Sequence, residues 1–253
     1  QTISHLCAEK AAGRLDQPAL LVAPTSLMKN WRDEVAKFAP HLVVLTLHGK
    51  ERIQQFRAVK NADLVLTTYG LVRRDSQKHA ETEYSWVILD EAQFIKNPRS
   101  KVTEVLCQMP CQRRLCLTGT QVENHLGELW SLFNFLMPGF LGEADAFKKQ
   151  FRIPIEQEAN ETLRAVLQKR VAPFLLRRKK IEVVKELPPK TEIDHPVEMT
   201  SRQRDIYESV RLAVHQRVKT EIANKGLARS QIVILDALMK LRQICCDPRL
   251  AKL

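Results

Sequence analysis

The feature that most constrains the fold is the heptad at residues 87–93, in which an apolar run ends on two adjacent carboxylates. The apolar residues 87–89 are typical of a short buried strand in a parallel sheet. Ligands of open α/β sheets bind beyond the carboxyl ends of the strands, and Asp90 and Glu91 follow at that point. The heptad therefore predicts either a functional carboxylate pair at a sheet edge or an ordinary acidic loop after a core strand.

The two carboxylates suit different tasks. Mg²⁺ prefers carboxylate, water and phosphate oxygens, so Asp90 is a candidate to hold it, in our prediction through water. Glu91 is one residue further on and points elsewhere, so it could orient or deprotonate an attacking water molecule. The pair thus divides into a metal-holding candidate and a water-orienting candidate.

A second stretch, residues 114–124, again places an apolar strand before a small polar turn and a helix start. With it the chain resembles the Swi/Snf-like ATPases, the DNA translocases of helicase superfamily 2. Residues 90–93 match the family's Walker B box in the spelling DEAQ, and residues 117–124 match its motif III, LTGTPxxN. Gln121 stands where the family has proline, which removes a rigid turn residue. The resemblance implies catalytic roles for Asp90, Glu91 and Gln93, and nucleotide coupling by Thr118, Gly119 and Thr120.

Further stretches match the same family in the same order. Residues 23–31 follow motif Ia (APTSLxxNW), residues 63–69 resemble motif Ib, and residues 174–180 resemble the basic connector FLLRRxK. The hydroxyls of Thr25 and Ser26, helix N-terminal amides and Lys29 are all phosphate ligands, although any capped helix of an α/β protein offers similar chemistry. The resemblance implies DNA contacts at Thr25, Ser26, Lys29, Asn30, Thr67, Thr68, Asn124, Arg177, Arg178 and Lys179.

The fold class implied is α/β, a RecA-like parallel sheet of the P-loop NTPase type with a helical protrusion. We expect residues 1–187 to form the first lobe, with motifs Ia, Ib, II and III, a protrusion at about 143–170 and a connector at 173–187. Residues 188–253 would begin a second, mostly helical lobe portion. The adjacent prolines 188 and 189 mark the boundary, because neither suits a helix interior.

Local patterns give further expectations. Strands are predicted at 19–23 and 42–47, a helix at 100–108, and an apolar helix at 126–137 capped by Asn124. Thr25 and Ser26 have helix-capping chemistry, and the helix after them should bury Leu27, Trp31, Val35 and Phe38. In the last part, residues 191–197 alternate as a strand, Thr200 and Gln203 form a capping box, and two helices follow, ending before Pro248.

Charge and composition narrow the partners. The 253-residue chain has a formal net charge of +11, which favours a polyanion partner, although a solvated surface that happens to be basic would give the same charge. The resemblance implies that the polyanion is double-stranded DNA. No run approaches the roughly 18 apolar residues of a membrane helix, so no membrane role is expected. The six cysteines lack zinc-finger and C-x-x-C spacing, which favours core thiols in a reducing compartment.

Several motifs of the family are missing. The chain contains no G-x-x-x-x-G-K-[ST] loop; its one Gly-Lys pair, Gly49-Lys50, is followed by Glu51. The family's motifs IV to VI, with the arginine finger, are also missing, and Gln1 resembles a cut made within a domain. Phosphoryl transfer needs these parts together with the carboxylates. We therefore expect ATP and Mg²⁺ to be used by a full-length parent protein, and the segment alone to be inactive.

The predicted function is part of an ATP-dependent translocase on double-stranded DNA that remodels protein–DNA complexes. Two alternatives remain: a strand-separating or RNA helicase of superfamily 2, and a DNA-binding piece without catalysis. The DEAQ spelling and compact protrusions look bacterial, which predicts a cytoplasmic, nucleoid-associated protein; a eukaryotic source would place it in the nucleus.

Overall fold

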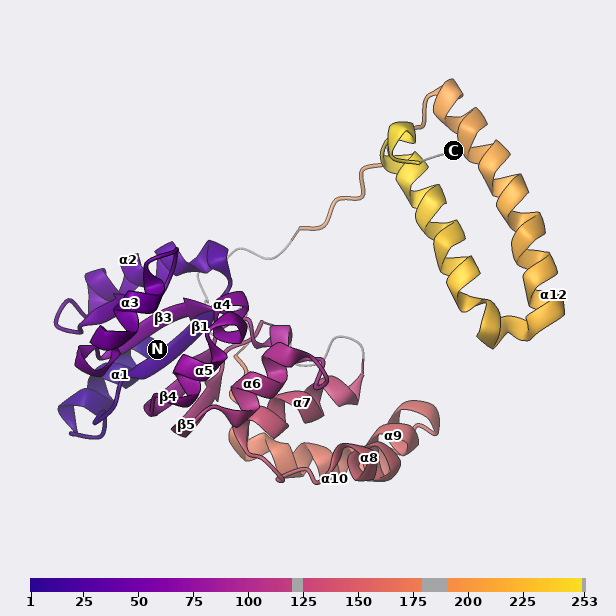
Figure 1. Ribbon diagram of the computed structural model, residues 1–253. Helices are drawn as coiled ribbons and strands as arrows, with labels where there is room; N and C mark the ends of the chain where they lie inside the picture. The colour runs from indigo at the N-terminus through magenta and orange to yellow at the C-terminus, as the bar shows by residue number, and fades with distance from the viewer. Residues whose placement is uncertain (120–124, 179–190, 252–253) are drawn as a thin grey trace. The chain divides into compact units, whose positions relative to one another are not determined.

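The computed structural model describes residues 1–119, 125–178 and 191–251 (Figure 1). The chain divides into two compact units, Gln1–Arg177 and Arg178–Leu253. The first unit contains the sheet and the motifs discussed above, and the second is a helical hairpin.

The first unit is built on a parallel sheet whose five strands lie in the order β2-β3-β1-β4-β5. The central strand β1 is buried along its whole length, as its continuous apolar run predicts. The predicted parallel α/β fold is therefore confirmed, with strands β1 Ala19–Ala23, β2 Val44–Thr46, β3 Leu64–Thr68, β4 Tyr84–Leu89 and β5 Cys111–Cys116.

The two faces of the sheet carry separate apolar cores, because successive residues of a strand point to opposite faces. Leu20 and Val22 pack into one core with residues of α4, α6 and α7, whereas Leu21 packs into the other with residues of α1 and α2. The helix bounds in this region are α1 Thr2–Ala11, α2 Met28–Phe38, α3 Arg52–Gln55, α4 Tyr69–Arg74, α5 Ser76–Ala80, α6 Lys101–Gln108 and α7 Leu126–Leu136.

The predicted helix at 100–108 is confirmed. Ser100 is the N-cap of α6, and its hydroxyl accepts a hydrogen bond from the Thr103 amide at 3.2 Å. The residue before α7, by contrast, is His125, which makes no side-chain cap hydrogen bond. The predicted cap, Asn124, lies outside the described residues.

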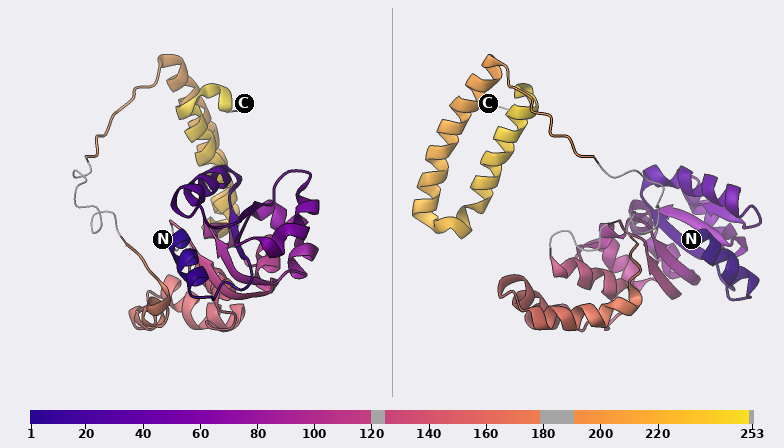
Figure 2. Two further views of the ribbon diagram at one scale, coloured as in Figure 1. Left: turned by 90° about the vertical axis from the view of Figure 1, so that its left-hand side faces the viewer. Right: turned by 180° about the vertical axis from the view of Figure 1, so that it is seen from behind.

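A helical module follows α7 and packs against it, as Figures 1 and 2 show. Phe133 of α7 shares an apolar core with Phe147, Phe151 and Leu167 of the module. Residues 143–170 are therefore helical, as expected. The module consists of α8 Ala144–Phe147, a π-helical turn Lys148–Arg152, α9 Ile153–Gln157 and α10 Glu161–Val171.

The second unit is dominated by α12, Ser201–Cys246, whose two arms meet at Gly226 (Figure 2). Gly226 has φ 75° and ψ 164°, a conformation that side chains disfavour, so a glycine is needed at this corner. Only half of the predicted capping box forms. Thr200 accepts from the Gln203 amide, but the Gln203 side chain donates to the carbonyls of Ile244 and Cys245 and so ties the two arms together.

Three local expectations are wrong. Residues 191–200 form no strand, and Ile193 and Val197 are more than 80% exposed; alternation alone supplies no neighbouring strand to pair with. Phe38, the last residue of α2, is 61% exposed rather than buried with Val35. Cys245 and the adjacent Cys246 are exposed at the end of the hairpin rather than in a core, although all six cysteines are free as expected.

Within the part of the chain that the structure describes, no helix combines the length and the apolar character needed to cross a membrane.

Candidate functional site

Backbone hydrogen bonds join the carboxyl ends of β1, β4 and β5 beyond the strands themselves. The Asp90 amide donates to the Val22 carbonyl at 2.9 Å, and the Leu117 amide donates to the Leu89 carbonyl at 2.7 Å. The Ala92 amide in turn donates to the Leu117 carbonyl at 2.9 Å. The turn after β4 is therefore fixed against the turn after β5, which brings the two predicted motifs side by side.

Both carboxylate oxygens of Asp90 are held in place. Oδ2 accepts from the indole Nε1 of Trp31 at 2.7 Å, and Oδ1 accepts from the Glu91 amide at 2.9 Å. An ionised carboxylate has about four lone-pair directions, so further acceptor capacity remains on this half-buried group. No cluster of three His, Cys, Asp or Glu side chains occurs among the described residues. Asp90 therefore fits a Mg²⁺ held by one carboxylate, water and phosphate oxygens rather than by a protein cage.

Tyr69, the first residue of α4, supports the same turn. Its hydroxyl donates to the Asp90 carbonyl at 2.8 Å, and its ring stacks on Phe94 with centroids 4.8 Å apart. Burial raises the pKa of the Tyr69 hydroxyl well above its usual value, and the nearby Cys116, Asp90 and Glu91 raise it further. The hydroxyl therefore stays protonated and keeps donating across the physiological pH range.

Glu91 has a left-handed backbone, with φ 52° and ψ 53°. A residue other than glycine in this region carries strain of about 1–3 kcal/mol, and such strain concentrates at functional sites. Its carboxylate accepts from Nε2 of Gln93 at 2.7 Å, and Oε1 of Gln93 accepts from the Thr118 hydroxyl at 3.1 Å. A side-chain relay thus links the DEAQ box to the turn after β5.

The structure thus brings together Asp90, Glu91, Gln93 and Thr118, which we call the acidic box. Gly119 is the next residue in the chain and the last one described before the gap at 120–124. Thr120, the other residue predicted to couple to nucleotide, and Asn124, a predicted DNA contact, lie outside the described residues.

The predicted DNA contacts of motif Ia are all exposed. Thr25 and Ser26 begin a 3₁₀ turn, Thr25–Leu27, that leads into α2. The predicted capping role is wrong, because the N-cap of α2 is Leu27 and no side chain caps either helix. The hydroxyls of Thr25 and Ser26 therefore make no capping hydrogen bond to a helix amide. Both residues are exposed, as are Lys29 and Asn30.

The two threonines of motif Ib are buried at the end of β3. Thr67 is 1% exposed, and its hydroxyl donates to the Leu47 carbonyl at 3.3 Å, so it offers nothing to a phosphate. Thr68 is 6% exposed but lines a hollow of about 390 Å³ together with Thr25. The burial follows from the position of both residues in a central strand rather than in the turn after it.

Several cations line two hollows beside Thr25, one of which Thr68 also lines. The 390 Å³ hollow and an adjoining one of about 220 Å³ lie after the carboxyl ends of β1, β2 and β3. We call their exposed polar lining the basic rim: Thr25, Lys29, Arg32, His48, Lys50 and Arg74.

Arg177 and Arg178 of the connector are also exposed, at the junction of the two units. The apolar residues before them are only partly packed: Phe174 contacts Phe140 with ring centroids 5.1 Å apart, and Leu176 is 81% exposed. Lys179 lies outside the described residues.

Sequence reasoning missed two groups. Trp31 and Tyr69 hold Asp90 but were assigned only to a helix face and a strand end, because a contact between residues 59 and 21 positions apart leaves no local signal. His48, Arg32, Lys50 and Arg74 were not singled out either. Their signal was available, since each lies near the carboxyl end of a strand or in the helix that follows it.

Comparisons with known proteins agree with this geometry. The family model described as SNF2-related domain matches residues 1–250. The TATA-binding protein-associated factor MOT1 of Saccharomyces cerevisiae is 36% identical, over 92% of this chain and 13% of that protein. An uncharacterized ATP-dependent helicase of Mycoplasma genitalium, MG018, is 38% identical over 90% of this chain and 21% of its own length.

Among solved structures, the Sulfolobus solfataricus SWI2/SNF2 ATPase core in complex with dsDNA matches with a TM-score of 0.68 and 33% identity. The match covers 99% of this chain and 52% of that one. The chain therefore spans well under two thirds of the length of each of these proteins. The RecA-like ATPase fold expected from the sequence is confirmed.

Proposed function

The chain belongs to the SNF2-related domain family, and from this premise we propose that it forms part of an ATP-dependent translocase on double-stranded DNA. The observation that carries the proposal is the acidic box, in which Asp90, Glu91, Gln93 and Thr118 are joined by hydrogen bonds at the carboxyl edge of the sheet. Groups that act in a transition state must be fixed before the reaction, and these groups are.

The proposed roles follow from the contacts. Asp90, oriented by Trp31, would hold Mg²⁺ through water, and the metal would supply charge neutralisation to the phosphates of ATP. Glu91 orients the attacking water, with its carboxylate positioned by Gln93. Gln93 passes the state of this carboxylate to Thr118, Gly119 and Thr120, the proposed nucleotide-coupling turn. The 253 residues hold no G-x-x-x-x-G-K-[ST] loop, so in this proposal the phosphate-binding loop and the arginine finger would have to come from elsewhere in the full-length protein.

The basic rim is the proposed duplex-binding surface. It offers hydroxyls and cations with no set of side chains suited to reading base edges, so it should contact phosphates and bind sequence-independently. Ser26, Asn30 and Thr68 extend it. Asn124, Arg177, Arg178 and Lys179 are further proposed contacts, whereas Thr67 is omitted because it is buried.

Helix α2 connects the two regions. It begins at Met28, at the end of the 3₁₀ turn that contains Thr25 and Ser26, and it carries Lys29. Within its first turn Trp31 donates to the proposed metal-holding carboxylate of Asp90. A shift of α2 on binding DNA would therefore change the hydrogen bond from Trp31 to Asp90. We propose this helix as the physical link by which duplex DNA stimulates hydrolysis and by which hydrolysis changes the grip on DNA.

Two other interpretations are distinguishable. A strand-separating or RNA helicase of superfamily 2 would use the same acidic box but release single strands. A DNA-binding piece without catalysis would bind the duplex while Glu91 and Gln93 were dispensable. The fixed relay between Glu91 and Thr118 favours a catalytic protein over a binding piece, since mere binding needs no such relay.

The test uses the full-length protein in three assays: ATP hydrolysis with and without duplex DNA, displacement of a third strand from a triplex, and unwinding of a forked duplex. We expect duplex-stimulated hydrolysis and triplex displacement without unwinding. Unwinding of the fork would favour the helicase, and duplex binding without hydrolysis would favour the binding piece. The 253-residue chain alone should hydrolyse no more ATP than its Glu91→Gln variant.

The cellular setting follows from the same proposal. A bacterial source would place the protein in the cytoplasm on nucleoid DNA, and a eukaryotic source would place it in the nucleus. We propose that movement of the protein along duplex DNA remodels protein–DNA complexes.

A further inference from the structure

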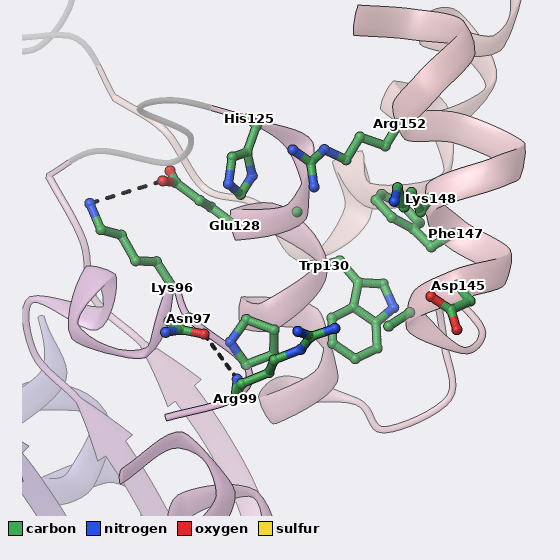
Figure 3. Close-up of a pocket in the computed structure, with 13 residues that line it drawn as sticks. Lys96, Asn97, Arg99, His125, Glu128, Trp130, Asp145, Phe147, Lys148 and Arg152 are labelled. Carbon is green, nitrogen blue, oxygen red and sulfur yellow. Dashed lines mark hydrogen bonds and ion pairs between the residues drawn. The ribbon is translucent and has the colours of Figure 1, made fainter. Parts of the chain in front are cut away.

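A further hollow lies apart from the acidic box and the basic rim. It has a volume of about 630 Å³ and lies between the loop after β4 and the helices α7 and α8 (Figure 3). Its size is that of a small-ligand pocket, roughly 300–1,000 Å³. We propose that this pocket binds a nucleotide unit, meaning a base, its sugar and a phosphate group.

Cations lie on two sides of the pocket. Lys96 and Arg99 come from the loop after β4, and Lys148 and Arg152 come from the helical module, about fifty residues later in the chain (Figure 3). Arg99 and Lys148 make no ion pair with any residue that the structure describes, and both are exposed. Two cations without partners, facing one hollow from different elements, suit a phosphate group.

The backbone around Lys148 and Arg152 is unusual. These residues are the first and last of the π-helical turn, and both line the pocket. π-Helical turns are rare and occur frequently at functional sites, because the extra residue redirects side chains from the regular helical positions. The π-helical turn thus contains both cations that the helical module contributes to the pocket, Lys148 and Arg152. This backbone irregularity is a second observation that does not depend on charge.

Arg152 is held in a fixed orientation. Its Nε donates to Glu156 at 3.0 Å, and the other oxygen of the Glu156 carboxylate accepts from the Leu126 amide at the start of α7. A Cβ at Gly127 would lie 2.9 Å from Nδ1 of His125 and 3.4 Å from Nη1 of Arg152. Glycine at this position therefore lets the imidazole and the guanidinium lie over the N-terminus of α7, with the terminal nitrogens of Arg152 directed toward it (Figure 3).

The remaining lining suits the base and sugar. Trp130 already donates its indole N–H to the Gly142 carbonyl at 2.9 Å, so what it offers a ligand is ring surface for stacking. Asp145 and Glu128 also line the pocket and can accept hydrogen bonds from amino or hydroxyl groups. Cations for phosphate, an aromatic face and carboxylate acceptors together match a nucleotide. An acidic peptide fits less well, because its carboxylates would leave the Trp130 ring face without a stacking partner and the two carboxylate acceptors without donors.

The 253-residue chain is suited to the test, because it has no Walker A loop that would bind nucleotide elsewhere. The probes are adenosine monophosphate and a four-nucleotide single strand, with binding measured by calorimetry and by quenching of tryptophan fluorescence. We expect saturable one-to-one binding of adenosine monophosphate. Arg99→Glu and Lys148→Glu should each weaken it about tenfold, which corresponds to about 1.4 kcal/mol.

Matched controls come from neighbouring exposed lysines that do not line the pocket. Lys101→Glu and Lys149→Glu make the same charge change close by and should leave the affinity within about twofold, since exposed charges are well screened. Trp130→Phe should retain binding while abolishing most of the fluorescence quenching. Lys29→Ala, in the basic rim, should not change the affinity for adenosine monophosphate.

The two sources of the ligand separate in the same experiment. A single strand that binds more than tenfold tighter than adenosine monophosphate would identify a nucleic acid, and equal affinities would identify a free nucleotide; either result supports the pocket. Absence of binding at millimolar nucleotide, equal weakening by the pocket and control variants, or stronger binding of a polyglutamate peptide would each overturn the proposal. None of these outcomes bears on duplex-stimulated hydrolysis, so the pocket and the proposed function can fail separately.

Discussion

The acidic box and the basic rim occupy the same edge of one sheet but are built differently. In the box, the carboxylates of Asp90 and Glu91 and the amide of Gln93 have hydrogen-bond partners at 2.7–3.1 Å. In the rim, Lys29 and Lys50 are exposed and pair with no residue that the structure describes. One region is rigid before any ligand arrives, and the other keeps its side-chain freedom.

The difference fits the two kinds of chemistry that we propose for these regions. Groups that stabilise a transition state become ineffective when displaced by about an ångström, so they must be held by neighbours. Phosphate contacts on a duplex depend mainly on charge and on the release of counterions, which tolerates mobile side chains. We therefore expect a single substitution in the acidic box to cause a large loss of turnover. Single substitutions in the basic rim should each cause a small loss of duplex affinity, and these losses should add.

The largest effect is expected from Glu91→Gln in the full-length protein. This change keeps the size and the left-handed backbone but removes the charge that orients water. Turnover should fall by about 10²–10⁴-fold while nucleotide binding is retained. Steady-state hydrolysis and nucleotide affinity measure the two parts, with Glu81→Gln on the exposed surface as the control. Equal turnover in Glu91→Gln and the wild type would mean that the acidic box takes no part in catalysis.

Arg52 sharpens the comparison, because it lines the same hollow as residues of the basic rim yet is held like a member of the acidic box. Its Nε and Nη2 donate to the two oxygens of Asp75 at 2.7 and 2.9 Å, and Asp75 is buried. The same pairing raises the pKa of Arg52. Arg52→Ala should therefore lower the free energy of unfolding by about 3 kcal/mol, since it leaves a buried carboxylate unpaired.

Lys50→Ala is the matched substitution for Arg52→Ala. Lys50 lines the same hollow but is exposed, so its removal should change the free energy of unfolding by less than about 0.5 kcal/mol. Urea denaturation of the two variants measures both values. If the two substitutions lowered the free energy of unfolding equally, the ion pair of Arg52 with Asp75 would add nothing to stability, and the distinction between held and mobile cations would be wrong.

The next effect concerns the link through α2. Trp31→Phe keeps an aromatic ring in the core but removes the N–H that donates to Asp90. A hydrogen bond to a charged group contributes about 1.5–3 kcal/mol, so the affinity for Mg²⁺-nucleotide in the full-length protein should fall about 10–100-fold. The concentration of Mg²⁺ needed for half-maximal nucleotide binding is the measurement, which does not require turnover.

Trp86→Phe is the control for this substitution. The indole nitrogen of Trp86 is buried without a hydrogen-bond partner in the described structure, so removing it should leave Mg²⁺ dependence unchanged. A fall of similar size in both variants would mean that removing a tryptophan from this core, rather than removing the hydrogen bond to Asp90, changes the site.

The elements that the sequence predicted well are those whose signal is local. The continuous apolar run of β1 predicted a buried central strand, and the DEAQ and motif III stretches, taken as strands followed by polar turns, lie side by side at the carboxyl edge of the sheet. The register of β3 was harder: the threonines at 67 and 68 belong to the strand itself, so they are buried rather than placed in the turn. The alternation at 191–197 predicted a strand because a pattern within one segment contains no information about a pairing partner.

The contacts that orient the site could not be predicted, because they join distant residues. Trp31 and Asp90 are separated by 59 positions, and Arg99 and Arg152 face one pocket from separate elements. Each contact depends on how helices are placed over the sheet. The sequence thus named the residues that we propose react, and the fold was needed to find what holds them.

The smallest effect is expected from single cations of the rim. Lys29→Ala in the full-length protein should weaken two unrelated duplexes by the same factor, because a phosphate contact carries no base information. The slope of log affinity against log salt concentration should fall by about 0.9 for each phosphate that is no longer neutralised. Arg178→Ala, in the connector, should do the same, and the double variant should show the sum of the two effects, since mobile side chains act independently. Hydrolysis without DNA should change little in either variant. A variant that weakened one duplex and spared the other, or a double variant whose effects failed to add, would mean that the rim is an ordered surface that reads bases, and the contrast with the acidic box would disappear.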